Sequence, residues 1–107
     1  MIKESLLYFA EDTTTADSGG LYSASSFLGM EVASATTCVL TFTAATNAAA
    51  IATVTLTFSG NFKDACRGIA GALNSNTMTV VADEANGVYM SYNGGEFSGT
   101  VTVDNVV

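Results

Sequence analysis

The chain has 107 residues, which is enough for one hydrophobic core, so we expect a single domain spanning residues 1–107. Its net charge of −7 argues against binding to nucleic acids or to an anionic membrane surface, because both need basic side chains that face phosphate groups. The sequence contains no His, the commonest general base and metal ligand, so we expect no enzyme, no metal and no cofactor.

The chain begins with a short apolar segment. Ser5–Phe9 is predicted to form a first strand, and the polar residues 11–20 are predicted to form a loop. The apolar run is short, is preceded by Glu4 and is followed at once by Glu11, so it does not resemble a signal peptide. No stretch approaches the length of a membrane span, and we therefore expect the chain to be made and folded in the cytoplasm.

Two strands with alternating side chains are predicted next, after a short extended segment that ends at Gly29. Residues 36–43 and 51–58 alternate apolar side chains with Thr, a pattern typical of a sheet that is covered on one face. The Ala-rich run 44–50 between them is predicted to be a hairpin loop. The side chains expected to face the core are Cys38, Leu40, Phe42, Val54, Leu56 and Phe58.

The period then changes to that of a helix, predicted over about residues 61–74. Asn61 is a suitable N-cap, and Asp64 suits the positive end of the helix dipole. Apolar residues recur at helical spacing and form one stripe, which we expect to cover the apolar face of the sheet. The stripe consists of Phe62, Ala65, Cys66, Ile69, Ala70 and Leu73.

The last third of the chain is predicted to contain three strands separated by two turns. The turns are Asp83–Gly87 and Asn93–Gly95, since Asn-Gly is a strong turn signal. The third strand should run from Glu96 to about Val103. In the three strands, the side chains that share one face are Met78, Val80 and Ala82, then Val88, Met90 and Tyr92, then Phe97, Val101 and Val103. The whole order predicts an α+β fold, a mostly antiparallel sheet or small sandwich with one amphipathic helix packed on it.

Cysteines and acidic residues offer little chemistry. Cys38 and Cys66 are too few for a disulfide framework, and we expect reduced core thiols, although a single strand-to-helix disulfide stays open. The acidic turn at 83–87 and Asp17 supply oxygen ligands of the kind that calcium binds, but their spacing matches no complete calcium loop. Scattered carboxylates could also act as a glycosidase pair, for which the spacing gives no signal.

Three features are candidates for an interface. Lys63 and Arg67 lie four residues apart on the helix and form either a solvated edge or a positive patch for a neighbouring copy. Gly68 and Gly71 interrupt the helix away from the predicted stripe, which favours either close approach of a neighbour or a merely weak helix. Tyr89 and Tyr92 could line a carbohydrate-binding face, or they could be the half-buried tyrosines that a sheet of this size normally carries.

Several segments resemble small virion structural proteins of tailed phages, particularly phages of marine cyanobacteria. The resemblance runs from the strand Val39–Phe42 to the turn after Asp83, and the opening Lys3–Phe9 also fits it. Its residues are Val54–Thr57, Ile69–Ser75 and Val80–Tyr89. The resemblance implies a virion part, and among such parts a capsid decoration or cement protein fits a short acidic chain best.

We therefore expect a virion structural protein on the capsid exterior, bound to the major capsid protein or other virion subunits as a homo-oligomer or within the lattice. Only 12% of the residues are charged, so Ser, Thr and Ala surfaces are expected, some of them covered by other subunits. The termini, the loops 11–20 and 44–50 and the Thr faces are the expected contacts. The alternatives are a tail or fibre component, or a module that recognises host glycan through Tyr89, Tyr92 and the turn 93–95.

Overall fold

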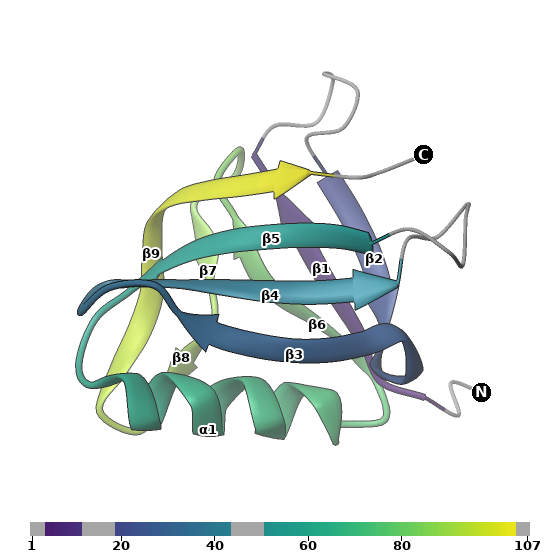
Figure 1. Cartoon of the computed structure of the whole chain (residues 1–107), viewed down its shortest axis with the longest axis horizontal. Coiled ribbons are helices and arrows are strands. Elements are labelled where there is room, and N and C mark those ends of the chain that lie inside the picture. The colour runs from purple at the N-terminus through teal and green to yellow at the C-terminus, as the bar shows by residue number, and fades with distance from the viewer. Residues whose placement is uncertain (1–3, 12–18, 44–50, 105–107) are drawn as a thin grey trace.

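The computed structural model describes residues 4–11, 19–43 and 51–104, which form two β-sheets and one α-helix (Figure 1). The predicted α+β class is confirmed, because the described chain is mostly strand and its helix packs on the sheets. The predicted loop 44–50, and most of the loop 11–20 with Asp17, lie outside the described residues. The elements are β1 (Leu6–Ala10), β2 (Gly19–Ser23), the 3₁₀ helix η1 (Ala24–Ser26), β3 (Phe27–Val32), β4 (Thr37–Thr43), β5 (Ile51–Phe58), α1 (Phe62–Leu73), β6 (Met78–Asp83), β7 (Val88–Tyr89), β8 (Ser91–Tyr92) and β9 (Gly95–Asp104).

The larger sheet has the strand order β3-β4-β5-β9-β8, and all its neighbours are antiparallel. Its two central strands are those with the strongest alternation in the sequence. Cys38 pairs with Leu56 and Leu40 with Val54, and these side chains are 0–1% exposed. The predicted inward set of β4 and β5 is confirmed, because strict period-two alternation places every second side chain on the covered face.

The smaller sheet has the order β2-β1-β6-β7 and contains a parallel pair, β1 with β6. A bulge shifts their register, so that Tyr8 pairs with Val80 but Phe9 pairs with Ala82. The skipped residue, Val81, is therefore fully buried beside Ala82. The predicted common face of Met78, Val80 and Ala82 is wrong for this reason.

The core lies between the two sheets and is rich in aromatic rings. Tyr22 of the smaller sheet stacks on Phe42 of the larger sheet, with ring centroids 4.5 Å apart. Phe9 and Phe27 approach the same Phe42 ring at 5.8 Å and 5.6 Å in tilted or edge-on arrangements, which such rings prefer. These ring contacts pack the smaller sheet against the larger one, so β1 and β2 lie behind β3 and β4 in Figure 1.

Helix α1 begins and ends close to the predicted bounds. The side chain of Asn61 caps it by accepting a hydrogen bond from the backbone N–H of Asp64 at 3.0 Å, as expected. The predicted stripe is partly wrong, since Phe62 is 55% exposed and Ala70 is also exposed. The buried residues are Ala65, Ile69 and Ala72, while Cys66 and Leu73 are half-buried.

Two predicted extended segments are divided by the tertiary structure. The single segment expected to end at Gly29 is instead β2, η1 and β3, and η1 carries the chain from one sheet to the other. The strand expected over 88–92 is split at Met90, because β7 pairs with β6 whereas β8 pairs with β9. Met90 donates its N–H to Val81 O at 2.9 Å and accepts from Phe97 N–H at 3.0 Å, so it links both sheets.

Strand β9 follows the prediction more closely. Phe97 and Val103 are buried, as expected for one face of this strand. Its pairing with β5 shifts between Leu56, which pairs with Val101, and Thr57, which pairs with Ser98. In the ranges that the structure describes, no helix is both long and apolar enough to cross a membrane.

Candidate functional site

One candidate surface is the outer face of the larger sheet, here called the threonine face. Because side chains alternate along a strand, the neighbours of the buried residues in β4, β5 and β9 point outward. They are all half-buried or exposed. The threonine face consists of Thr37, Val39, Thr41, Thr43, Ile51, Thr53, Thr55, Thr57 and Thr102.

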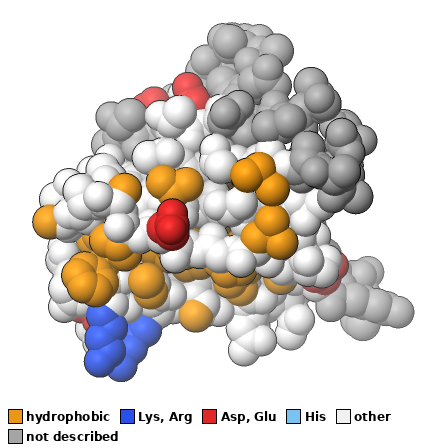
Figure 2. All heavy atoms as spheres, viewed as in Figure 1, with side chains coloured by type: hydrophobic (Ala, Val, Ile, Leu, Met, Phe, Trp, Pro, Cys, Tyr) orange, Lys and Arg blue, Asp and Glu red, His pale blue; other side chains and the backbone are white. Residues whose placement is uncertain are grey.

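The threonine face is ordered in rows and carries little charge. Thr41 of β4 pairs with Thr53 of β5, and Thr55 of β5 pairs with Thr102 of β9. Thr side chains that lie opposite one another on neighbouring strands stabilise the sheet. None of its nine residues is charged, but two acidic residues pair with them: Glu31 pairs with Val39, and Asp104 pairs with Thr53. Figure 2 shows this side of the protein as mostly uncharged polar surface with scattered hydrophobic groups.

Strand β3 borders the threonine face and is an outer strand of the larger sheet. Leu28 is 58% exposed and Val32 is 38% exposed on this strand. An edge strand also presents backbone N–H and C=O groups that no neighbouring strand of its own sheet occupies. The threonine face therefore continues into an edge that offers both apolar and hydrogen-bonding contacts.

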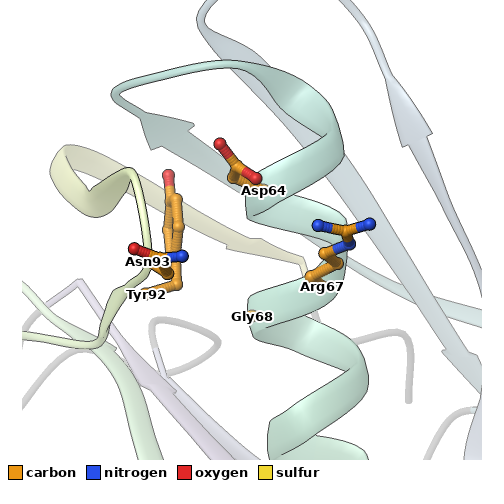
Figure 3. A pocket seen from close by; sticks show the side chains of 5 residues that line it. All are labelled: Asp64, Arg67, Gly68, Tyr92 and Asn93. Carbon is orange, nitrogen blue, oxygen red and sulfur yellow. The ribbon is translucent and has the colours of Figure 1, made fainter.

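A second candidate lies beside the first turns of α1, here called the helix hollow. It is lined by Asp64, Arg67, Gly68, Tyr92 and Asn93 and has a volume of about 240 Å³. Figure 3 shows the first three residues on the helix and the last two opposite them, with Tyr92 on β8 and Asn93 in the turn that follows it. The hollow thus joins two elements that pack together only in the folded chain.

Small residues permit the close approach of these two elements. A Cβ atom at Gly60 would lie 2.3 Å from Gly94 O, and one at Gly95 would lie 2.4 Å from Ser59 O. Gly60 and Gly94 also have φ values of 77° and 108°, which L side chains rarely adopt. These glycines let the start of α1 and the β8–β9 turn meet backbone to backbone.

Tyr92 is held firmly at the wall of the helix hollow. Its hydroxyl donates to Ser59 O at 2.7 Å and lies 3.2 Å from Glu96 O, and its ring meets Phe97 edge-on at 5.2 Å. Burial raises the pKa of Tyr92, and the nearby Cys38 adds to the rise, while the hydrogen bond to Ser59 opposes it. The phenol therefore stays protonated at neutral pH and keeps its donor role.

The six candidate interface residues are not brought together as one surface. Arg67, Gly68 and Tyr92 meet at the helix hollow, whereas Lys63 does not line it. Lys63 and Arg67 are both exposed, and Figure 2 shows basic side chains gathered near one end of α1. Tyr89 lies on β7, half-buried against the core rather than beside Tyr92.

The two helix glycines have different surroundings, so they do not form a common contact surface. A Cβ atom at Gly68 would meet the Tyr92 side chain at 3.0–3.1 Å, whereas one at Gly71 would meet nothing within 4 Å. Gly68 is therefore approached by a neighbour within the same chain. The expectation that both glycines lie away from the buried side of the helix is wrong for Gly68, because Tyr92 packs there.

Asp64 and Asn93 complete the hollow, but their joint role was not evident from the sequence. The sequence predicts only a helix-dipole role for Asp64, whereas Asn93 belongs to the turn 93–95 that the glycan alternative includes. The spacing of 64, 67 and 68 places these three residues on adjacent turns of one helix side, which is a signal that the sequence does contain. Their meeting with Tyr92 and Asn93 depends on the pairing of β9 with β5, which places the β8–β9 hairpin beside the start of α1.

The remaining candidate groups are engaged locally. Asp83 is only 7% exposed, and its carboxylate accepts hydrogen bonds from the backbone N–H and the side-chain amide of Asn86, at 3.3 Å and 2.9 Å. The described residues contain no group of three or more His, Cys, Asp or Glu side chains placed to hold a metal. Cys38 and Cys66 are free thiols, and burial raises the pKa of Cys38 to about 12.

Comparison with known proteins does not place the chain in a family. No family model matches it, and neither the curated proteins nor the solved structures give a significant match.

Proposed function

We propose that this chain is a structural component of a phage virion, most simply a capsid decoration or cement protein that stabilises neighbouring capsid subunits. The observation that supports the proposal is the threonine face, an ordered sheet surface whose nine residues carry no charge, on a protein whose net charge is −7. The resemblance of several segments to virion proteins of tailed phages supports the same assignment.

The chemistry of the threonine face suits contact with another protein. Burying a charge at an interface has a large desolvation cost, and the nine residues of this face carry none. A Thr hydroxyl both donates and accepts hydrogen bonds, and its methyl group adds apolar contact. The nine residues can therefore be covered by another subunit without burying a charge of their own, while a partner that also covers Glu31 or Asp104 would need to pair or hydrate its charge.

Binding across a junction would also benefit a domain of this size. A chain of 107 residues has a thin stability margin when it is alone, and any partner that binds only its folded form stabilises it by mass action. A stable contact would need to cover roughly 800 Å² on each partner. The threonine face, together with the exposed edge of β3, is the described surface we assign to that contact.

The copy number in purified particles tests the role. Quantitative mass spectrometry of virions should find the chain in hundreds of copies, in a fixed ratio to the major capsid protein. A few copies per particle would move the protein to the tail or a fibre, and its absence from particles would overturn the proposal.

A pair of matched variants tests the surface. Thr55→Lys places a charge in the centre of the threonine face, whereas Thr77→Lys makes the same change at an exposed position between α1 and β6. We expect Thr55→Lys to reduce binding to particles that lack the protein by at least about tenfold, which corresponds to about 1.4 kcal/mol. Equal binding of the two variants, both folded by circular dichroism, would exclude the threonine face as the contact.

A further inference from the structure

The helix hollow gathers groups of four chemical kinds around a small space. Asp64 supplies a carboxylate, Arg67 a guanidinium, Asn93 an amide and Tyr92 an aromatic ring. At Gly68 the wall is bare backbone, because a side chain there would meet Tyr92. The hollow thus combines one aromatic ring with several convergent polar groups, and convergent polar groups are what orient a ligand in a small-molecule site.

Within the described chain, the two charged side chains of the hollow are free to bind a ligand. Asp64 and Arg67 lie three residues apart on α1, yet the described residues show no hydrogen bond or ion pair from the Asp64 carboxylate or the Arg67 guanidinium. The Tyr92 hydroxyl, in contrast, is already bonded to Ser59 O. Tyr92 therefore offers its ring to a ligand, while Asp64 and Arg67 offer hydrogen bonds.

The charges select the class of ligand. An anion would be attracted by Arg67 but repelled by Asp64 and by the net charge of −7. A simple cation would be attracted by Asp64 but repelled by Arg67. A neutral polyhydroxylated ring meets neither repulsion. Its hydroxyls can donate to the Asp64 carboxylate and accept from Arg67 and from the Asn93 amide, while its C–H groups contact the Tyr92 ring.

We propose that the helix hollow binds one sugar unit of a neutral saccharide. Its volume of about 240 Å³ lies just below the range of roughly 300–1,000 Å³ that is typical of ligand pockets, which suits a single ring. The exposed Arg67 and Asn93 leave the hollow open to solvent, so the ring can belong to a longer glycan. This inference does not depend on the capsid role, because the threonine face and the hollow use different residues.

Nuclear magnetic resonance of the intact ¹⁵N-labelled chain tests the site. The probes are the methyl glycosides of glucose, galactose, mannose and N-acetylglucosamine, with glycine and inorganic phosphate as charged comparators. We expect at least one glycoside to give saturable shifts of the backbone amides of Arg67, Gly68 and Asn93, with a Kd in the millimolar range. Silence with all four glycosides, or a saturable response at these amides only to glycine or phosphate, would overturn the proposal.

Variants of the lining residues give the second test. Arg67→Ala and Asn93→Ala should each weaken binding at least about tenfold, because each removes hydrogen bonds to the sugar. Lys63→Ala is the matched control, since it removes a neighbouring helix cation that does not line the hollow. If Arg67→Ala and Asn93→Ala keep dispersed spectra and bind as the unchanged chain does, the site is wrong.

The two proposals can fail separately. Thr55→Lys is expected to lose particle binding while retaining the response to the glycoside, and Arg67→Ala is expected to show the reverse. Loss of glycoside binding in Thr55→Lys, without unfolding, would count against the position of the sugar site.

Discussion

The buried side chain of Cys38 should make the stability of the protein depend on pH. It lies on β4 at 0% exposure, and burial, followed by the nearby Cys66, raises the pKa of its thiol to about 12 from an ordinary value near 9. The folded chain therefore holds this proton more tightly than the unfolded chain does. The buried thiol is a hydrophobic core group, not a reactive nucleophile, because a nucleophilic cysteine requires the thiolate.

The pH dependence of stability follows from that shift. Below about pH 9 the thiol is protonated in both states, so the contribution of Cys38 is fully present. As the pH rises from about 9 to about 12, the unfolded chain loses the proton first, and the free energy of unfolding should fall. Urea denaturation at a series of pH values measures this slope.

A Cys38→Ala variant is the control for the alkaline slope. Its free energy of unfolding should fall less steeply over the same pH range, with a remaining decline from Tyr92, whose pKa burial also raises. Slopes are compared rather than absolute values, because removing the thiol also changes packing. An identical slope in the unchanged chain and in Cys38→Ala would contradict the assignment.

At the scale of the element, α1 shows that one helix can contain two glycines with opposite roles. Gly71 is exposed and faces open space, so its missing side chain only weakens the helix. Gly68 faces Tyr92, which Phe97 and the backbone oxygens of Ser59 and Glu96 hold in place. The Tyr92 ring therefore has little freedom to move away from an added methyl group.

Alanine at the two positions should consequently have opposite effects. Gly71→Ala is expected to raise the free energy of unfolding by about 0.5–1 kcal/mol through helix propensity. Gly68→Ala should lower it, because its Cβ would lie 3.0–3.1 Å from atoms of Tyr92. Thermal and urea denaturation of the two variants measure the difference.

Replacing Tyr92 by alanine tests whether its ring is the reason that Gly68→Ala destabilises the protein. In a Tyr92→Ala background, Gly68→Ala should become neutral or stabilising, since the opposing atoms are gone. If Gly68→Ala costs as much in that background as in the unchanged chain, the contact with Tyr92 does not explain the glycine.

At the scale of the whole molecule, two sheets share one aromatic core while most of their pairing is between sequence neighbours. The two exceptions are the pairing of β1 with β6, which brings the start of the chain beside a strand that follows the helix, and the pairing of β5 with β9, which brings together strands on either side of the helix. β1, β4 and β5 each have strands on both sides, whereas β7 and β8 are two-residue strands at the sheet ends.

Native-state hydrogen exchange should reflect this arrangement. The slowest amides are expected in β1, β4 and β5, where hydrogen bonds are flanked on both sides and the side chains are deeply buried. The amides of β7 and β8 should exchange faster by at least about tenfold. Slow exchange confined to the larger sheet would show that the smaller sheet opens separately.

Much of the local structure was predictable because it depends on neighbours in the sequence. The alternation in β4 and β5 defined their buried faces, and Asn61 defined the start of α1. The turn at Asn93–Gly94 was equally clear, since Asn-Gly favours it. The sequence indicated Arg67, Gly68 and Tyr92 as interface candidates, but it gave no sign that these residues meet one another and Asp64 at one hollow.

The sequence by itself determined the α+β class, the inward residues of the central strands and the cap of the helix, because local periodicity and capping chemistry act within a few residues. Only the tertiary structure decided the division into two sheets, the parallel pairing of β1 with β6 and the split of 88–92 at Met90. Those features depend on hydrogen bonds between distant segments and on a bulge at Val81. The periodicity of apolar residues in the sequence does not reveal either of them. The long-range pairing of β9 with β5 brings the β8–β9 hairpin beside the start of α1, so that Tyr92 meets Gly68 and the helix hollow forms.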